Sequence, residues 1–517
     1  MNERKLGIVL SYMSTGIQAL VGLIYLPMLF HYLTPAQYGI YQLMGSAIAY
    51  LSIMEFGLAN TTTRYISRAL AINNTKEMNT IIATSHTIYC IVSVVLFFFG
   101  LVFYFCIDNI YSHTLSINEL GVAKQIYMIM LINVAVLIQS NIFTSVINAH
   151  ERFLFLRGLN LLQVIIQPLL VWGLLAWHSN VLNIALAQTI CLWAVVGINY
   201  WYCKRNLHLS FHLQLTYTPF FKELIGFSIF VFLHMLIDQI YWRSGQLILG
   251  AVIGPIAVAI YAIAMQVAMF VSFMPTTMGG VFLPKLSASI ATQQGLNSIN
   301  SLFCKLGRLQ FMLFMLLLIG FIFLGKIFLL LWIGHGYELV YWLVLIIMVG
   351  YLFDVTQSVG IPTLQAMKKH AFRAYVYVVM AVLNITLAIP LAKLYGEIGC
   401  ATSTAICLWL GPGIAMNWYY WYLGIDIKTF FMHIAKLIVP VSISALVTWL
   451  IFMCLPLKTE WFNFIWHGIL LILVYAIIMW CLACNAYEKN LIFQPMHQLM
   501  IYTKKLFAPK EQTNSSV

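Results

Sequence analysis

Long, uninterrupted apolar runs constrain this chain more than any other feature of its sequence. Of its 517 residues, 62% are hydrophobic and only 8% are charged. A helix needs roughly 20 consecutive apolar residues to cross the hydrocarbon core of a bilayer. Runs of that length recur along the whole sequence. The sequence therefore predicts an all-α polytopic membrane protein, because no soluble domain has this composition.

The basic residues support about fourteen transmembrane helices. The expected spans are 7–31, 39–60, 80–106, 122–148, 153–177, 181–203, 221–252, 255–281, 304–333, 336–361, 372–394, 397–423, 430–455 and 461–484. With both termini placed in the cytoplasm, 22 of the 27 Lys and Arg residues fall on the cytoplasmic side. Four fall on the outer side, and Arg243 lies deep within a span. Cytoplasmic loops carry such an excess of basic residues, so the bias favours both the count and the orientation.

Two short sequence matches indicate an internal repeat. Thr34-Pro35 and Tyr41 recur as Gly254-Pro255 and Tyr261, and the tetrapeptide 190–193 recurs at 406–409. Both offsets cover six expected helices, so the two halves would share one orientation. We expect two six-helix lobes around a central cavity, with two further C-terminal helices. The expected boundaries are 1–208 for the first lobe, 209–424 for the second, 425–487 for the last two spans and 488–517 for a cytoplasmic tail.

The segment Phe227–Gly250 interrupts the apolar pattern with ionisable residues. At 100° per residue, polar residues occupy one half of this helix and apolar residues the other. The polar half consists of His234, Asp238, Gln239, Arg243 and Gln246. Charge at bilayer depth costs about 2.5–3.5 kcal/mol per residue, so such residues generally face a cavity and mark function. An internal Asp238–Arg243 pair that only fixes packing is the alternative, although their spacing puts them about 140° apart.

Polar stripes on other expected spans fit the same cavity. They include Gln18 on the first span, Glu55 and Arg64 on the second, Asn141 on the fourth and Asp354 on the tenth. Helix packing through hydrogen bonds explains the neutral members equally well. The carboxylates of Asp354 and Glu55 favour function, since acidic residues inside a span are rare. Glu55 is the weaker of the two because it lies near the expected cytoplasmic interface.

Motifs of soluble enzymes are missing from the sequence. It contains no Walker A motif, no HExxH and no GxSxG in a strand–turn–helix context. The ten cysteines lie mostly in apolar runs and resemble small hydrophobic residues rather than a disulfide framework. We therefore expect no catalytic residue, no metal site, no cofactor and no nucleic-acid partner.

Several short motifs carry a resemblance to a known family. They are Tyr38-Gly39, Glu55-Phe56-Gly57-Leu58, Arg64-Tyr65, Asp238-Gln239-Ile240, Ile248-Leu249-Gly250, Val258-Ala259-Ile260-Tyr261 and Phe282-Leu283-Pro284-Lys285. In this order they resemble the Wzx-type oligosaccharide flippases of the MATE-like (MOP) superfamily, over roughly the first 420 residues. Relatives often carry a charged pair where this chain has Gly245-Gln246.

The resemblance implies transport of undecaprenyl-diphosphate-linked oligosaccharide repeat units across the bacterial cytoplasmic (inner) membrane for surface polysaccharide assembly, by alternating access. Membrane lipids and the polysaccharide polymerase machinery are further implied partners. A diphosphate needs fixed positive charge, for which Arg243 and Arg64 are candidates. The candidates for contacts with the sugars are Gln239, Gln246, Asn141 and Gln18. The candidates for coupling to a cation gradient are Asp238, Asp354, His234 and Glu55, and the coupling itself is left open.

Two other functions compete with this interpretation. A MATE-type multidrug or cation antiporter would have the same fold, but it would need an acidic or apolar cavity for cationic drugs. A membrane scaffold without transport activity would leave the intramembrane charges unexplained.

Overall fold

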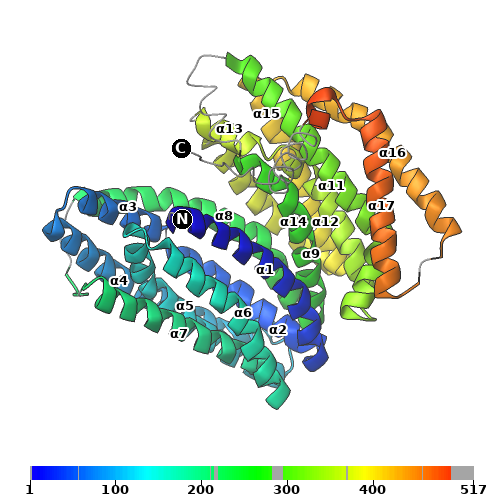
Figure 1. Cartoon of the computed structure of the whole chain (residues 1–517). Coiled ribbons are helices and arrows are strands. Elements are labelled where there is room, and N and C mark those ends of the chain that lie inside the picture. The colour runs from blue at the N-terminus through cyan, green and yellow to red at the C-terminus, as the bar shows by residue number, and fades with distance from the viewer. Residues whose placement is uncertain are drawn as a thin grey trace, which may run out of the picture. The chain divides into compact units, whose positions relative to one another are not determined.

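A computed structural model describes residues 3–55, 57–209, 211–214, 219–281, 295–367, 369, 371–456 and 458–490. Every regular element within these ranges is a helix (Figure 1), which confirms the all-α class. The motif Phe282–Lys285 and all of the expected tail beyond residue 490 lie outside the described residues.

The elements follow one another with short connections. The earlier ones are α1 (Glu3–Tyr32), α2 (Pro35–Ser52), η1 (Ile53–Glu55), α3 (Leu58–Ala71), α4 (Thr75–Tyr111), α5 (Ile117–Ala149), α6 (Phe153–Trp177), α7 (Leu182–Asn206), α8 (Pro219–Val252) and α9 (Pro255–Val281). The later ones are α11 (Gly295–Ile333), α12 (Glu338–Thr356), α13 (Gly360–Ala366), α14 (Ala371–Leu408), η2 (Trp409–Ala415), α15 (Met416–Tyr422), α16 (Ile427–Cys454) and α17 (Trp461–Leu482).

Eleven helical stretches among the described residues are long and apolar enough to cross a membrane. One of them, Ala371–Tyr422, has 52 residues, which is about 78 Å of helix and more than twice the bilayer core. It bends at Gly396, whose φ of 63° and ψ of −137° are not helical. This glycine lies between the expected spans 372–394 and 397–423. The membrane-spanning class is thus confirmed, and the number fourteen stays a prediction.

The chain divides into two compact units. The first comprises Met1–Ala268, Trp332–Gly350 and Arg373–Gly411, and the second Met269–Leu331, Tyr351–Phe372 and Pro412–Val517. In the first unit, α5 packs against α2, α3, α4 and α7, while α1 lies along α6 and α2 along α8. In the second unit, α16 and α17 lie side by side (Figure 1). The lobe boundaries expected from the repeat stay a prediction.

Proline and capping residues define where several helices begin. Pro35 and Pro255, the two prolines of the expected repeat, are the first residues of α2 and α9. This position suits proline because its missing N–H has no intrahelical partner there. Thr34 and Gln37 cap α2 by exchanging hydrogen bonds between side chain and backbone, of 3.0 and 3.3 Å.

Asp426 begins α16 in the connection that precedes this helix. Its carboxylate accepts a bond of 2.5 Å from Thr429 Oγ1 and one of 3.0 Å from the Thr429 backbone N–H. These bonds from the hydroxyl and the backbone of Thr429 favour the charged carboxylate and hold the pKa of Asp426 below its ordinary value. The cap fixes the start of α16 outside the apolar part of the helix.

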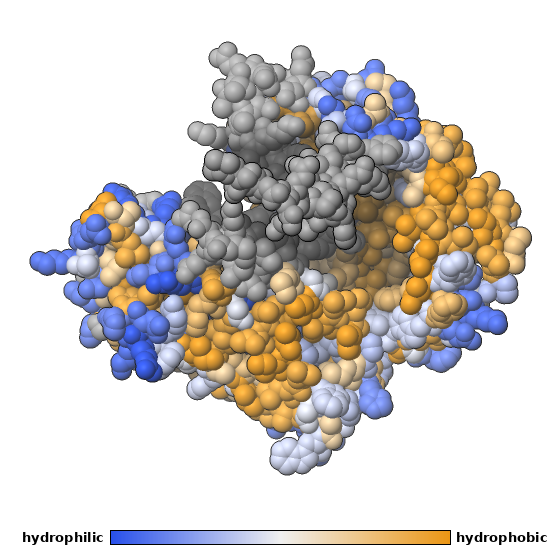
Figure 2. Space-filling view, in the orientation of Figure 1, coloured by the Kyte–Doolittle hydropathy of each residue, from blue (hydrophilic) through white to orange (hydrophobic). Residues whose placement is uncertain are grey.

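Large apolar side chains cover the outer surface of the helices. On α17, Phe462, Ile469 and Ile477 are 82%, 47% and 61% exposed. Figure 2 shows apolar residues across the face formed by α16 and α17. Exposed apolar area of this extent indicates contact with lipid rather than with water.

Candidate functional site

Arg243 lies on α8 in the first unit, with its side chain half-buried. Among the side chains that the structure describes, none forms a hydrogen bond or ion pair with its guanidinium. Tyr38, Tyr41 and Tyr50 on α2 lie close enough for electrostatic interaction with it. A guanidinium carries five N–H donors and no acceptor. The structure therefore leaves a strong donor group beside three tyrosines, with its own hydrogen-bonding capacity unused by the described residues.

The tyrosines beside Arg243 are themselves oriented by amide side chains. Tyr38 Oη accepts a bond of 2.6 Å from Gln42 Nε2. Tyr41 Oη likewise accepts a bond from Gln188 Nε2 of α7. Each phenol thus uses a lone pair for the amide and keeps its own O–H, which no described acceptor receives. The arrangement presents O–H and N–H donors together and suits an anion.

Tyr25 of α1 extends this group of donors. Its hydroxyl is buried, has no hydrogen-bond partner among the described residues and lies near Tyr38 and Tyr41. A buried hydroxyl without a partner costs about 1–3 kcal/mol. A bound group that accepts its hydrogen bond would remove this cost. We call Arg243, Tyr25, Tyr38, Tyr41 and Tyr50 the donor cluster.

Close packing fixes α8 beside the donor cluster. Ser46 Oγ on α2 donates to the side-chain oxygen of Gln246, and both side chains are buried. A Cβ at Gly245 would lie 2.7 Å from the ring of Tyr261 on α9. The close approach of this ring gives a physical reason why a larger residue, such as the first of the charged pair of relatives, does not occur at residue 245.

The structure brings only some of the expected substrate-binding residues together. Gln246 is engaged with Ser46, while the Gln239 side-chain oxygen is buried and has no hydrogen-bond partner among the described residues. Asn141 on α5 lies beside Glu55, and Arg64 on α3 is exposed with its guanidinium over the ring of Tyr65 at 5.3 Å. Gln18 on α1 is exposed. These roles stay predictions, and sequence reasoning did not identify the tyrosines of the donor cluster as site residues.

The expected ion-coupling residues are dispersed. Glu55 ends η1 in the first unit and Asp354 lies on α12 in the second, and both are half-buried. Asp238 and His234 lie on α8, but the placement of their side chains is outside the described residues. Their roles in coupling stay predictions.

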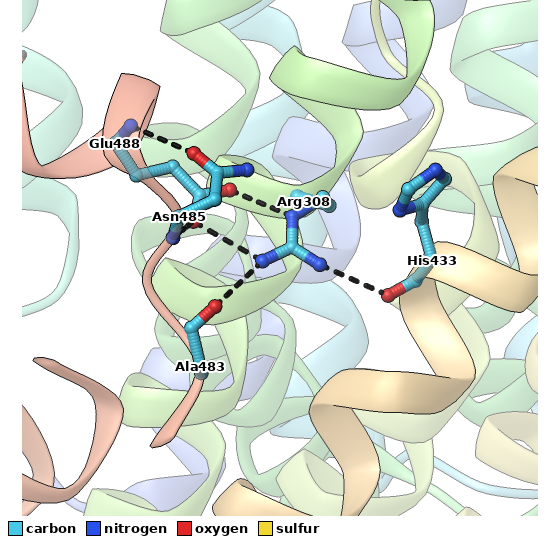
Figure 3. A network of polar contacts seen from close by, with 5 residues as sticks. All are labelled: Arg308, His433, Ala483, Asn485 and Glu488. Atoms are coloured by element: carbon cyan, nitrogen blue, oxygen red, sulfur yellow. Dashed lines mark hydrogen bonds and ion pairs between the residues drawn. The ribbon is translucent and has the colours of Figure 1, made fainter. Parts of the chain in front are cut away.

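The second unit contains a buried ion pair that sequence reasoning missed. Arg308 on α11 was expected among the cytoplasmic basic residues, yet it is only 6% exposed, and Glu488 is 2% exposed. Arg308 Nε and Nη2 donate to the two oxygens of Glu488 at 2.7 and 3.1 Å. Further bonds reach the carbonyls of Ala483 (2.9 Å) and His433 (3.3 Å), as Figure 3 shows. No sequence signal connects two residues that lie 180 positions apart.

Span 10 was expected to line up Asp354, Gln357 and Ser358 on one face of a single helix. Instead α12 ends at Thr356 and α13 begins at Gly360. Gln357 Nε2 donates to Asn417 Oδ1 at 2.8 Å, and Ser358 Oγ accepts a bond of 2.6 Å from Gln310. These buried amides connect α11, α15 and the α12–α13 turn, so helix packing accounts for this part of the stripe.

Comparisons with known proteins agree with this architecture. A family model described as "Polysaccharide biosynthesis protein" matches residues 6–290. A Shigella flexneri protein named as an O-antigen transporter is 22% identical over 397 residues, which cover 75% of this chain and 90% of that protein.

Two solved structures have the same fold. The lipid II flippase MurJ in an inward closed conformation superposes with a TM-score of 0.68 at 15% identity, over 95% of this chain and 99% of MurJ. An inward-facing multidrug resistance MATE transporter of the MOP superfamily superposes with a TM-score of 0.64 at 14% identity, over 82% of this chain and 99% of that one. The match to more than half of the sequence, together with the MATE-like fold, confirms the resemblance: this chain belongs to the polysaccharide biosynthesis protein family.

Proposed function

We propose that this protein is a flippase that moves lipid-linked oligosaccharide repeat units across the bacterial cytoplasmic membrane for surface polysaccharide assembly. Family membership and the relative named as an O-antigen transporter support this substrate class. The fold is shared with a lipid II flippase. In this proposal the protein works by alternating access, without chemical catalysis, and polysaccharide polymerase machinery receives the translocated unit.

The donor cluster is the observation that carries the proposal. The lipid and the sugar of such a substrate are joined by a diphosphate, which has oxygen acceptors, negative charge and no donor. The guanidinium of Arg243 provides charge-assisted bonds in a fork that matches phosphate oxygens. Tyr38 and Tyr41 keep free O–H groups beside it because Gln42 and Gln188 donate to their oxygens. The cluster thus complements a diphosphate in both charge and hydrogen-bond polarity.

The two buried-side arginines of the chain differ in a way that supports this assignment. Arg308 donates four bonds to fixed protein acceptors and has no capacity to exchange a ligand. Arg243 donates none to the described residues, so a mobile anion can occupy its donors. A transported substrate has to be released, which favours a cation that lacks a permanent partner.

A multidrug antiporter is the second candidate, because a MATE transporter has the same fold. Its substrates are cationic, and the donor cluster has the wrong polarity for them. Fold similarity at 14% identity does not carry function.

Substitution of Arg243 tests the proposal in a host that lacks its own copy of the protein. Arg243→Ala should lower surface polymer at least about tenfold at normal membrane abundance, since charge-assisted bonds contribute about 1.5–3 kcal/mol each. Arg243→Lys should retain part of the export, because the charge survives and the planar fork does not. Tyr41→Phe should have a smaller effect of roughly fivefold, corresponding to one neutral hydrogen bond.

Arg157→Ala, which removes an exposed charge from α6, is the matched control and should leave export unchanged. Lipid-linked intermediates should accumulate in the Arg243→Ala strain, and sensitivity to cationic drugs should stay the same. Full export from a normally abundant Arg243→Ala protein would exclude the diphosphate site. Drug hypersensitivity with intact export would support the antiporter instead.

A further inference from the structure

The second expected span is broken at the position of an acidic residue. The sequence predicts one helix over residues 39–60, whereas α2 ends at Ser52 and a single 3₁₀ turn ends at Glu55. Gly57 has a φ of 65°, and α3 begins after it with no side-chain cap. A break leaves backbone carbonyls at the end of one helix and N–H groups at the start of the next without intrahelical partners. Inside a membrane, such irregular backbone is tolerated where it lines a site.

Oxygen-bearing side chains surround this break in the first unit. Asn141 of α5 lies beside the carboxylate of Glu55. Tyr89 of α4 is 1% exposed and lies near Glu55, and its hydroxyl has no hydrogen-bond partner among the described residues. The hydroxyls of Thr62 and Ser145 lie near that of Tyr89, and both side chains are buried. A buried, unpartnered hydroxyl beside a carboxylate is a second sign, independent of the helix break, that a ligand belongs there.

The charge of Glu55 is not balanced by the protein as far as the structure describes it. No Lys, Arg or His among the described residues forms an ion pair with it. No backbone N–H of α3 donates to it either, so the carboxylate is not a helix cap. Titratable or charged residues near Glu55, or on the elements packed against η1, are Tyr50 on α2, Tyr89 on α4, and Asp238 and Arg243 on α8. An uncompensated carboxylate within a membrane helix is costly and needs a cation.

We infer that Glu55, with Asn141 and Tyr89, forms a site for a monovalent cation, either a proton or a sodium ion, that is exchanged during transport. The ligands on offer are oxygens only, from one carboxylate, one amide, hydroxyls and the carbonyls at the end of α2. A divalent ion generally takes more than one carboxylate in such a site. One negative charge matches one monovalent cation. The inference rests on the proposed transport function only for the purpose of the exchange, not for binding.

Binding is measured on the purified full chain in lipid nanodiscs without any oligosaccharide. Infrared difference spectra between acidic and alkaline buffer report carboxyl protonation, and radioactive sodium binding reports the metal ion. Glu55→Gln should lose a carboxyl band if the ligand is a proton, or saturable sodium binding if it is sodium. Asp108→Asn, which removes an exposed carboxylate on α4, is the control and should keep the signal of this site.

Tyr89→Phe provides a variant that retains the charge and should weaken sodium binding or shift the titration of the band. Normal amounts of folded Glu55→Gln protein with unchanged band and unchanged sodium binding would overturn the inference. The assay contains no substrate, so its result is independent of the flippase proposal. If binding is present and polymer export is normal in Glu55→Gln, the site exists but does not drive transport, and the coupling part of the inference fails.

Discussion

At the scale of single residues, the surroundings of a charge decide its role more than its depth in the sequence pattern. Arg243 and Arg308 both belong to long membrane helices. One faces tyrosine hydroxyls, and the other is enclosed by a carboxylate and two carbonyls. The same side chain is thus available to a ligand in the first unit and committed to structure in the second.

Gly39 allows a prediction at this scale because it permits a close approach of α2 to α9. A Cβ at this position would lie 1.8 Å from the carbonyl oxygen of Pro255. Backbone cannot move aside as a flexible side chain does, so Gly39→Ala should destabilise the protein by about 1–3 kcal/mol. Reduced membrane abundance and a lower midpoint in thermal unfolding of the purified protein should show this.

Gly45→Ala is the matched control on the same helix. Nothing lies within 4 Å of a Cβ at this position, and alanine favours helix by about 0.8–1.0 kcal/mol over glycine. The control should therefore be neutral or slightly stabilising. Equal behaviour of the two variants would contradict the close packing of α2 on α9.

At the scale of elements, the Arg308–Glu488 pair ties the segment after α17 to α11. Removing one partner of a buried ion pair costs about 3–5 kcal/mol, whereas replacing both by apolar residues is often neutral. Arg308→Met and Glu488→Leu should each lower the thermal unfolding midpoint, and the double variant should recover part of the loss. Export per folded molecule should remain normal, because this pair contacts no part of the donor cluster.

Lys436→Met on α16 is the control for this cycle, since its side chain is exposed. It should leave the midpoint unchanged. Single variants that are as stable as the parent protein would show that the pair contributes nothing to the stability of the fold.

The elements also show what sequence reasoning achieves and where it ends. Apolar length predicts the helices, and the unusual charge of α8 predicts Arg243, because both depend on local composition. The breaks at Glu55 and after Thr356 are not predicted, since hydropathy continues through them. The donor cluster is missed for a related reason: its tyrosines count as apolar in a periodicity argument, and only the fold shows that amides occupy their lone pairs.

At the scale of the whole molecule, the described helices constrain the topology of the chain. Each of α4, α5, α6 and α7 is long enough to cross the bilayer once. The connections after α3, α5 and α7 therefore lie at one end of these helices, and those after α4 and α6 at the other. Basic residues gather at the first end: Arg64, Arg68, Lys76, Arg152, Arg157, Lys204 and Arg205. Lys124, which pairs with Asp108, lies at the other.

We expect the basic end to be cytoplasmic, because basic connections are retained on that side during insertion. Reporters fused after Asn74 and Glu151 should give cytoplasmic signals, whereas fusions after His113 and Asn180 should give signals from the outer side. The same rule, carried along fourteen spans, places both termini in the cytoplasm. Since α4 crosses once, the fusions at Asn74 and His113 must differ, which makes each a control for the other. Outer-side activity at Asn74 together with cytoplasmic activity at His113 would invert the orientation, and the cytoplasmic leaflet could then no longer be the side from which the substrate enters.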